Sequence, residues 1–479
     1  MISGKNILTN AVLLIASSLI NLGISLITTS FIARTLGPEL YGKYTFGLTY
    51  IFFFSVLANF GIEILFVRDA ARDKDNISRM IMDIMHLKFG LSLLTVGVIV
   101  VSAKLLNYPE STLHVIYVLS IGLIFQILYM TLISVYKSLE KMFVVALFSV
   151  TFRVITAIMI VGSIYFGMGL MGIIWTFMLG NALIFLAACV YFYKDYKIFY
   201  IKVNINKWVS LIAGGIPFYL SALLSMVYFK INIIILSKMQ GELEIGYYMA
   251  AATLVETLYF VPEAVTTSIY PAFSRIYGIS IEALKKTYSK MMKYVIIITV
   301  AVCVGCILVG DKILLLIYGE RFQNSVQILN ILILWWVFMF ISTIMSTLLF
   351  AINKEKYQVR VMGIACVINV VLSVSMIGNY GFIGAAYALT ITEATTILIL
   401  AFILWQNHIM YIPDWTIARL AGVLLAMVFT VKALSNVHVV VEIAAGAITY
   451  LAFLFIMRIF DSEDLVYIKS FVKRGAKYL

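Results

Sequence analysis

The sequence is poor in charged residues, proline, cysteine and histidine. Only 12% of its 479 residues are charged, and it contains 6 prolines, 4 cysteines and 4 histidines. The cysteines lie in apolar runs. Cys303 and Cys306 have the spacing of a redox motif, but their place in an apolar helix favours packing, because thiol exchange needs an accessible thiolate. The histidines are too scattered to bind a metal together, and no phosphate-binding P-loop motif occurs. We therefore expect no metal, no cofactor and no enzymatic activity.

Long polar segments are missing as well. The longest gap between apolar runs, near residues 272–290, is too short for a folded domain. Hydrophobic residues make up 63% of the chain, and they form about 14 runs that can each cross a bilayer as a helix, which takes roughly 20 residues. Membrane barrel strands are only about ten residues long and alternate in polarity. The sequence therefore predicts an all-α polytopic membrane protein with spans near 10–33, 44–66, 84–103, 113–136, 143–166, 169–193, 209–236, 245–271, 291–309, 328–350, 357–377, 381–405, 416–434 and 437–458.

Lysine and arginine are sorted to alternate loops. If the N-terminus is cytoplasmic, 25 of the 35 basic residues fall in inside loops and 7 in outside loops. Because cytoplasmic loops are enriched in these residues, we predict a multi-pass plasma-membrane protein with both termini in the cytoplasm. The net charge of +12 then reflects contact with anionic membrane lipids, not with nucleic acid. The first apolar run is too long for a cleavable signal peptide.

Three weak matches indicate an internal repeat. The turn Gly37–Tyr44 resembles Gly241–Tyr248 at an offset of 204 residues, and Gly169–Gly172 resembles Gly381–Gly384 at an offset of 212. The inside turn that contains Lys137 and Lys141 likewise corresponds to the one with Lys354 and Lys356. We predict an N-terminal six-helix lobe (1–205), a C-terminal six-helix lobe (206–405), and two additional transmembrane helices with a cytoplasmic tail (406–479). Such parallel repeats are common in transporters with a central cavity.

Ionisable groups inside apolar runs are candidates for function, because charge within a bilayer is costly. Arg153 lies in the middle of its run and could hold an anionic head group such as phosphate, since arginine stays charged and offers several donors. The alternative is a structural ion pair, for example with Glu63. Lys88 and Lys230 also fall within runs, and Lys230 could join the same site or reach the membrane interface. Arginines at helix ends could contact a phosphate or only set the topology: Arg34, Arg68 and Arg275.

Carboxyl groups in the apolar runs are candidates for ion coupling. Buried carboxylates can bind a proton or a sodium ion, and the alternative is pairing with Arg153 or Lys230. Glu256 and Glu263 are seven residues apart, so we expect them to share one face of a helix. The coupling candidates are Glu63, Glu256, Glu263 and Glu393, and the candidate hinges are Gly23 and Pro217, which weaken or bend their helices.

The turn Phe31–Gly42, with Arg34-Thr-Leu-Gly-Pro38 at its centre, resembles the first outer turn of the polysaccharide-biosynthesis flippases, often called Wzx-type. These belong to the MATE-like superfamily of multidrug, oligosaccharidyl-lipid and polysaccharide exporters. Three further segments extend the resemblance over nearly the whole chain: Ile317–Ser325, Asn369 and Tyr380–Ala388.

The resemblance implies two six-helix bundles that flip a polyprenyl-pyrophosphate-linked oligosaccharide, such as an O-antigen unit, from the inner to the outer leaflet by alternating access. It implies a cationic cavity for the head group and a groove for the lipid tail beside the last two helices. It also implies coupling to H⁺, Na⁺ or the membrane potential, and contact with other polysaccharide-assembly proteins. Related lipid II flippases place arginines in their first helix, whereas residues 10–33 here contain none. Arg153, Lys230 or an end residue such as Arg34 must then supply the charge.

Three other functions fit parts of the sequence. A cation-coupled multidrug exporter of the same superfamily predicts an acidic cavity in the first lobe, whereas Arg153 is the lone charge in the middle of its run. A membrane polymerase or ligase of the same pathway predicts a sizeable outer loop with catalytic residues, and none is present. A large scaffold without transport activity would not need charges inside the membrane.

Overall fold

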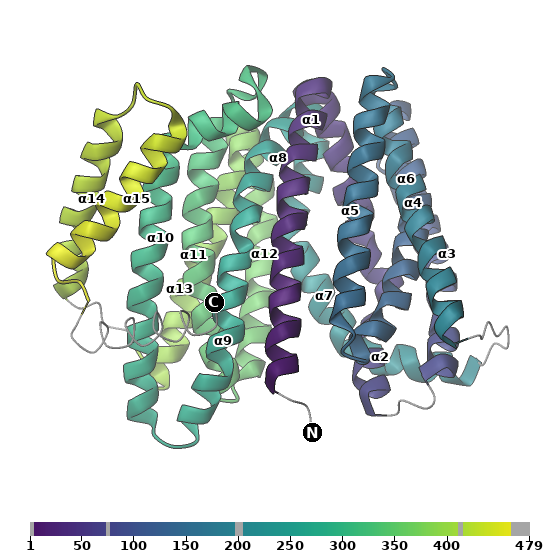
Figure 1. Cartoon of the computed structure of the whole chain (residues 1–479), viewed down its shortest axis with the longest axis horizontal. Helices are drawn as coiled ribbons and strands as arrows, with labels where there is room; N and C mark the ends of the chain where they lie inside the picture. The colour runs from purple at the N-terminus through teal and green to yellow at the C-terminus, as the bar shows by residue number, and fades with distance from the viewer. Residues whose placement is uncertain (1–3, 73–76, 197–204, 411–414, 461–479) are drawn as a thin grey trace. The chain divides into compact units, whose positions relative to one another are not determined.

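The computed structural model describes residues 4–72, 77–196, 205–410 and 415–460 (Figure 1). Within these ranges the chain forms α-helices and two short 3₁₀ helices, and no β-strand. The α-helices are α1 (Gly4–Asn59), α2 (Ile62–Arg72), α3 (Ile77–Leu105), α4 (Glu110–Ser138), α5 (Met142–Tyr165), α6 (Gly169–Tyr196), α7 (Ile205–Met239), α8 (Glu242–Glu256), α9 (Phe260–Tyr277), α10 (Ile281–Tyr318), α11 (Ser325–Ala351), α12 (Glu355–Tyr380), α13 (Phe382–Gln406), α14 (Trp415–Ala433) and α15 (Val439–Ile456). The 3₁₀ helices are η1 (Thr257–Tyr259) and η2 (Glu320–Phe322).

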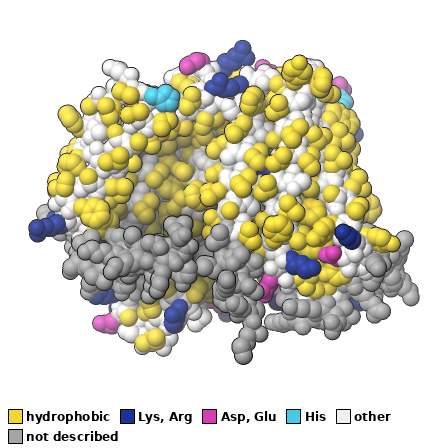
Figure 2. Space-filling view, in the orientation of Figure 1, with side chains coloured by type: hydrophobic (Ala, Val, Ile, Leu, Met, Phe, Trp, Pro, Cys, Tyr) yellow, Lys and Arg dark blue, Asp and Glu magenta, His cyan; other side chains and the backbone are white. Residues whose placement is uncertain are grey.

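The predicted all-α polytopic architecture is confirmed. Among the described residues, 11 helices are long and apolar enough to cross a membrane, and the first of these stretches, Leu13–Asn59, has 47 residues. Hydrophobic side chains cover most of the face shown in Figure 2, while charged ones gather toward its upper and lower margins. That distribution is the one expected of helices surrounded by lipid.

The first two predicted spans form one kinked element. Gly37 has φ 73° and ψ 176°, and it is the one residue inside α1 with non-helical dihedral angles. Pro38 then opens the second helical segment, a position where its missing N–H costs nothing. The loop expected between the two spans is therefore a single residue. The second span was also predicted too long, because the positive φ angles of Phe60 and Gly61 end the helix there and turn the chain into α2.

The predicted span 245–271 is interrupted in the structure. α8 ends at Glu256, the 3₁₀ helix η1 follows, and α9 begins at Phe260. Pro262 explains the break, because proline has no N–H to donate to the carbonyl of Leu258, four residues earlier. Glu256 and Glu263 therefore do not belong to one continuous α-helix. Three residues with 3₁₀ geometry rotate the following side chains by about 60° relative to an α-helix. Because residues seven apart in an α-helix are about 20° out of line in the opposite sense, the two side chains still project in directions only about 40° apart.

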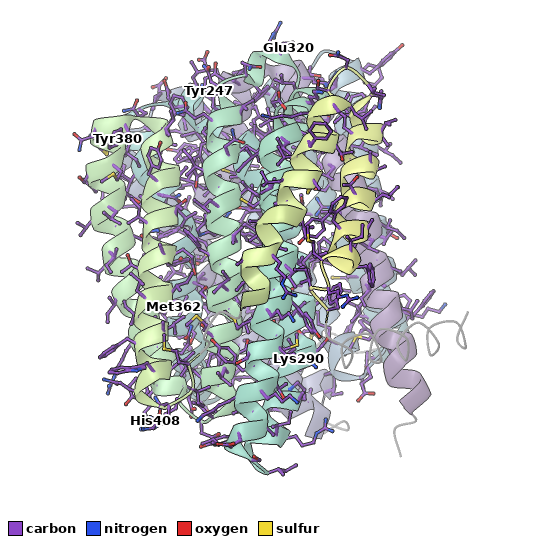
Figure 3. The ribbon with its side chains drawn as sticks, turned by 90° about the vertical axis from the view of Figure 1, so that its left-hand side faces the viewer. Tyr247, Lys290, Glu320, Met362, Tyr380 and His408 are labelled. Atoms are coloured by element: carbon purple, nitrogen blue, oxygen red, sulfur yellow. The ribbon has the colours of Figure 1, made fainter. Side chains whose placement is uncertain are left out.

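The chain divides into two compact units, each described here by itself. Unit 1 contains residues 1–250, 317–322 and 366–385, and unit 2 contains residues 251–316, 323–365 and 386–479. The core of unit 1 joins α2, α3, α4, α5 and α6 through buried side chains such as Phe66, Tyr136 and Phe192. Tyr247, Glu320 and Tyr380 lie toward one end of this unit (Figure 3). The lobe boundaries at 205 and 405 stay a prediction.

Unit 2 contains the two C-terminal helices, which lie side by side in Figure 1. Val423 and Met427 of α14 and Tyr450 of α15 share a buried cluster with Ile297 and Val309 of α10. The Tyr450 hydroxyl donates a hydrogen bond of 2.7 Å to the Ile297 carbonyl. Both helices are thereby attached to α10 by apolar packing.

Helix boundaries repeat along the chain, as the sequence matches predicted. α5 begins at Met142 and α12 at Glu355, 213 residues later, and α6 and α13 begin at Gly169 and Phe382 with the same offset. Left-handed backbone recurs as well. Glu140 and Asn353, just before α5 and α12, both have φ 57°, so the two inside turns share one conformation.

A close crossing in unit 1 joins the two matching glycine turns. A Cβ atom added to Gly42 of α1 would meet the carbonyl oxygen of Glu242, and one added to Gly246 of α8 would meet the carbonyl oxygen of Pro38. Gly42 corresponds to Gly246, and Pro38 to Glu242, at the same offset of 204 residues, so the contact is reciprocal, as it is across a twofold axis. Only glycine lets two helix backbones approach this closely.

Candidate functional site

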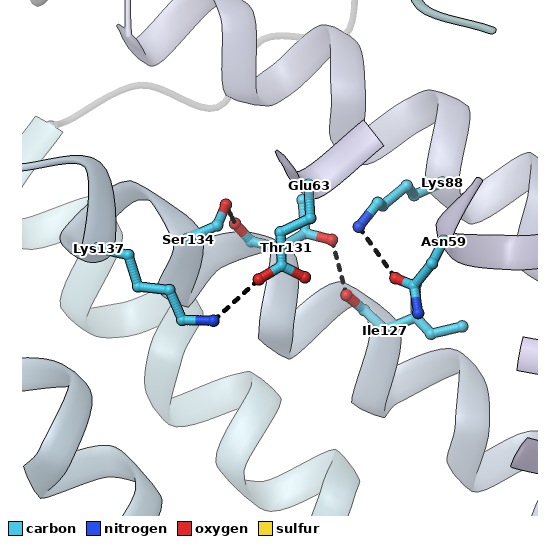
Figure 4. Close-up of polar contacts among 7 residues, drawn as sticks. All are labelled: Asn59, Glu63, Lys88, Ile127, Thr131, Ser134 and Lys137. Carbon is cyan, nitrogen blue, oxygen red and sulfur yellow. Dashed lines mark hydrogen bonds and ion pairs between the residues drawn. The ribbon is translucent and has the colours of Figure 1, made fainter. Parts of the chain in front are cut away.

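Charged side chains gather between α1, α2, α3 and α4 in unit 1 (Figure 4). Glu63 of α2 pairs with Lys137 of α4 at 2.9 Å. Lys88 of α3 is completely buried and donates a hydrogen bond of 3.2 Å to the side-chain oxygen of Asn59 at the end of α1. The cluster thus contains two lysines and one carboxylate, with Lys137 paired to Glu63 and Lys88 bound to the Asn59 amide.

The turn between α1 and α2 sets the position of this cluster. A Cβ atom on Gly61 would lie 2.5 Å from the Cβ atom of Phe218, so only glycine allows α7 to pack so near. The ring of Phe60 stacks on Tyr219 with centroids 4.4 Å apart and planes 7° from parallel. These contacts fix the turn that places Asn59 and Glu63 against α3 and α4.

The other carboxylates of α2 and α3 are also paired. Asp83, whose side chain is 7% exposed, pairs with Lys207 of α7 at 2.8 Å. Asp69 accepts a hydrogen bond of 2.8 Å from Arg68, the residue before it, and this contact raises the pKa of the exposed Arg68 guanidinium. Arg68 is thus engaged on its own helix. Unit 1 offers no free carboxylate on α2 or α3 within the described residues.

Arg153 differs from these residues. It lies in the middle of the apolar helix α5 and is half-buried. Its side chain forms no hydrogen bond or ion pair with a residue whose side chain is described, and its electrostatic neighbour is the Tyr44 phenol. The alternative ion pair between Arg153 and Glu63 is not formed, and Lys137 pairs with that carboxylate instead.

Other polar groups lie one helical turn from Arg153. Ser149 precedes it by four residues, so both side chains project from the same face of α5. The side-chain amide of Asn21 in α1 donates a hydrogen bond of 2.7 Å to the Ser149 hydroxyl. The buried oxygen of the same amide has no hydrogen-bond partner among the described atoms. A polar strip therefore runs beside the guanidinium.

The segments that carry the family resemblance meet at one end of unit 1. Nε of Arg34 donates a hydrogen bond of 3.0 Å to the Ile317 carbonyl. The ring of Tyr41 contacts that of Phe322 with centroids 5.7 Å apart, and Tyr247 contacts Phe382 at 5.9 Å. Arg34 is exposed and bound to backbone, a role that its position at a helix end did not reveal.

The remaining predicted cations and hinges lie on three different helices, α1, α7 and α9. Lys230 is half-buried in α7, and Arg275 is exposed in the last turn of α9. Gly23 has helical geometry, with no atom within 4 Å of an added Cβ, and Pro217 lies inside α7. The backbone break in α1 is at Gly37, where the Gly-Pro dipeptide was the available signal.

The candidate coupling carboxyls of unit 2 have different surroundings. Glu393 of α13 is 3% exposed and accepts a hydrogen bond from the Ser342 hydroxyl of α11. Glu256 is half-buried at the end of α8, whereas Glu263 is exposed on α9. Glu393 is thus the most enclosed of the three.

Sequence reasoning missed a buried ion pair in unit 2. Glu442 of α15 is 1% exposed and pairs with Lys312 of α10. Lys312 also donates a hydrogen bond of 2.7 Å to the Ser435 carbonyl. Glu442 lies in the last apolar run, so the criterion that selected Glu393 would have found it.

Among the described residues of unit 2, two pockets differ in character. One, of about 440 Å³, is lined by apolar side chains of η1, α10, α14 and α15 and by the one carboxyl group of Glu442. The other, of about 530 Å³, lies between α9, α11 and the start of α12 and is lined by polar and aromatic side chains. Both volumes are in the range of small-molecule sites.

Comparison with known families and sequences gives a consistent result. The family model described as "Polysaccharide biosynthesis protein" matches residues 7–277, and the MatE model matches residues 217–375. A Shigella flexneri protein named "Putative O-antigen transporter" is 23% identical over 396 residues, which cover 79% of this chain and 93% of that protein. A Shigella dysenteriae protein of the same name is 24% identical over 183 residues, which cover 38% of this chain and 46% of that protein.

Solved structures share the fold. "Lipid II flippase MurJ, inward closed conformation" superposes with a TM-score of 0.73 at 16% identity, covering 94% of this chain and 99% of that one. An inward-facing multidrug resistance MATE family transporter of the MOP superfamily gives a TM-score of 0.64 at 15% identity, covering 82% and 98%.

Proposed function

Because the chain belongs to the polysaccharide biosynthesis protein family, we propose that this multi-pass membrane protein flips a lipid-linked oligosaccharide between leaflets. The O-antigen transporter name of its relative and the fold shared with a lipid II flippase support this class of substrate. The proposed cargo is a polyprenyl-pyrophosphate-linked oligosaccharide that moves from the inner to the outer leaflet of the plasma membrane. Every relative named above is a transporter or flippase, so transport proceeds without covalent chemistry.

The isolation of Arg153 is the observation that carries this proposal. A guanidinium in the middle of a span, without a carboxylate partner among the described residues, can bind a pyrophosphate through several charge-assisted hydrogen bonds. The carboxylates of α2 and α3 are neutralised by Lys137, Lys207 and Arg68. Unit 1 therefore supplies positive charge for an anionic head group.

The lipid part of the substrate needs a different environment. The apolar pocket beside α14 and α15 offers one for a polyprenyl chain, in agreement with the tail groove that the family resemblance implies. The head group and the tail are then bound by different parts of the protein.

The direction of transport follows from charge. A pyrophosphate carries about two negative charges, and an inside-negative potential favours their outward movement by about 2.3 kcal/mol per charge per 100 mV. With both termini in the cytoplasm, alternating access would load the head group inside and release it outside. Coupling to H⁺ or Na⁺ through Glu393 is a second energy source. Membrane lipids and other polysaccharide-assembly proteins are the proposed partners.

The test is leaflet exchange of a fluorescent polyprenyl-pyrophosphate oligosaccharide in proteoliposomes that contain the full chain. We expect exchange that responds to an imposed potential, and loss of exchange in Arg153→Ala at unchanged protein abundance. Arg360→Ala, a change of an exposed arginine on α12, is the matched control and should flip normally. Normal flipping by Arg153→Ala would remove Arg153 from the site, and loss of the folded protein would assign it a structural role.

A cation-coupled multidrug exporter is the second candidate. The match of residues 217–375 to the MatE model and the enclosed carboxyl group of Glu393 favour it. It predicts ion-driven uptake of a cationic dye by the same proteoliposomes, with no exchange of the lipid-linked oligosaccharide. Glu393→Gln should then abolish uptake, while Arg153→Ala should not.

A further inference from the structure

The polar pocket of unit 2 has the chemistry of a carbohydrate site. α9, α11 and the turn before α12 meet around a space of about 530 Å³. Its lining contains hydroxyl, amide and carboxyl groups, unlike the pocket beside α14 and α15, where Glu442 and the Tyr450 hydroxyl are the polar groups. The side chains that carry the argument are Thr267, Tyr270, Thr347, Phe350, Asn353 and Glu355.

Several of these groups have free hydrogen-bonding capacity. The side chain of Asn353, the Tyr270 hydroxyl and the Glu355 carboxylate have no hydrogen-bond partner among the residues whose side chains are described. Thr267 and Thr347 donate their hydroxyl protons to backbone carbonyls at 2.7 Å, which leaves their oxygens as acceptors. The pocket thus presents both donors and acceptors, as a ligand rich in hydroxyl groups requires.

Two aromatic rings add an apolar surface to the same pocket. Tyr270 is 46% exposed and Phe350 is 43% exposed. The faces of aromatic rings carry partial negative charge, and they pack against the polarised C–H groups of a pyranose ring. Stacking combined with amide and carboxylate hydrogen bonds is a chemistry that suits a sugar.

The charge of the pocket disfavours the pyrophosphate part of the substrate. No lysine or arginine is among its described lining residues, and the one charged group, Glu355, repels a phosphate. Lys354 is next to Glu355 in sequence, but its ammonium lies over the ring of Tyr357, 5.7 Å from the centroid. A neutral sugar therefore fits better than a pyrophosphate.

The internal repeat explains why the pocket is open. At the offset of 204 residues that relates the starts of α3 and α10, Thr267 corresponds to Glu63. At the offset of 213 that relates α5 and α12, Phe350 corresponds to Lys137. In the first half of the repeat these positions form the ion pair of Figure 4. In the second half they hold a hydroxyl group and a ring, which do not pair, so space remains.

We propose that this pocket binds a neutral sugar residue of the oligosaccharide head group, an inference that rests on the flippase function proposed above. The turn with Asn353 and Glu355 lies in a loop predicted to be cytoplasmic, so the sugar would be bound on the side where the substrate is loaded. Asn353 is suited to its position, because asparagine tolerates the left-handed backbone better than most residues.

Saturation-transfer NMR with the full-length protein in nanodiscs tests the pocket directly. The probes are the methyl glycosides of glucose, galactose and N-acetylglucosamine, each added alone. We expect at least one to bind and binding to weaken about tenfold in Asn353→Ala and in Tyr270→Ala, the effect of losing one or two contacts. Tyr277→Ala, an exposed tyrosine on α9 outside the lining, is the control and should bind normally.

Three results would overturn the proposal. They are the absence of binding for all three glycosides, equal binding by the wild type and both pocket variants, and binding of the cation tetraphenylphosphonium that is lost in Glu355→Gln while no glycoside binds. The last result would identify a drug site.

Leaflet exchange distinguishes this proposal from the flippase function. We expect Asn353→Ala to slow a sugar-bearing polyprenyl pyrophosphate and to leave sugar-free polyprenyl pyrophosphate unchanged. If the wild type exchanges neither lipid, the flippase function is wrong, whereas the NMR result still decides whether the pocket takes a sugar.

Discussion

The close crossing of α1 and α8 predicts that a single added methyl group lowers the stability of the protein substantially. A Cβ atom on Gly42 would meet the carbonyl oxygen of Glu242 and lie 2.7 Å from the nitrogen of Gly246. Both obstructing atoms belong to the backbone, so no side-chain rotation makes room. Ordinary contacts between heavy atoms are about 3.5 Å long. The substitution Gly42→Ala therefore requires the two helices to move apart by about 1 Å or more.

The expected cost follows from this displacement. Overpacking a well-packed site costs about 1–3 kcal/mol, and Gly42→Ala should lie at the upper end because the backbone itself must shift. The displacement also loosens the ion pair between Lys43 and Glu242, now 3.0 Å long. Gly246→Ala should cost a similar amount. The double variant should cost less than the sum, because helices already separated accommodate the second methyl group.

Thermal unfolding of the purified protein in detergent measures the effect. Gly23→Ala is the matched control, since it lies in the same helix α1 and an added Cβ meets nothing within 4 Å. We expect a clearly lower midpoint for Gly42→Ala than for Gly23→Ala. Equal midpoints would refute the close crossing. The same control tests Gly23 as a hinge, because a stable Gly23→Ala protein with slow flipping would support that role.

The ion pairs of Glu442 and Glu63 give further predictions. Glu442→Gln should speed amide hydrogen exchange in α15, because loss of one partner of a buried pair costs about 3–5 kcal/mol, reduced here by the partial exposure of Lys312. Unchanged exchange would contradict this reasoning and would mean that the hydrogen bond from Lys312 to the Ser435 carbonyl holds α15 in place without the ion pair. Lys137→Met should lower the unfolding temperature modestly, because it leaves the half-buried Glu63 unpaired and partial exposure weakens such pairs. Adding Glu63→Gln should restore part of the lost stability. A double variant less stable than Lys137→Met would contradict the pairing.

The helical membrane architecture was predictable because lipid imposes it. A bilayer leaves backbone groups no partner but one another, so long apolar runs must be helices, and the sequence shows where most of them lie. The repeat was visible for a similar reason, since turns such as Gly169 and Gly381, with φ 60° and 61°, need glycine. The signals for the kink at Gly37 and the break before Pro262 were also local, but each was read as part of a longer regular element.

The partners of the charged residues could not be predicted. Glu63 and Lys137 are 74 residues apart, and Asp83 and Lys207 are 124 apart, so only the packing of α2, α3, α4 and α7 decides which ammonium reaches which carboxylate. From the sequence alone, Arg153 was as plausible a partner for Glu63 as Lys137.

Which of the two cations pairs with Glu63 decides which one is left to bind a substrate. Because Lys137 neutralises Glu63, the charge of Arg153 remains available to an anion. The second half of the repeat replaces the Glu63 and Lys137 positions with Thr267 and Phe350, and there the ion pair gives way to a neutral polar pocket. Unit 1 thus contains a cation without a carboxylate partner among the described residues, and the pocket of unit 2 contains hydroxyl, amide and aromatic groups. The proposed cargo contains a group suited to each, a pyrophosphate for the first and a sugar for the second, whereas a cationic drug would be repelled by Arg153.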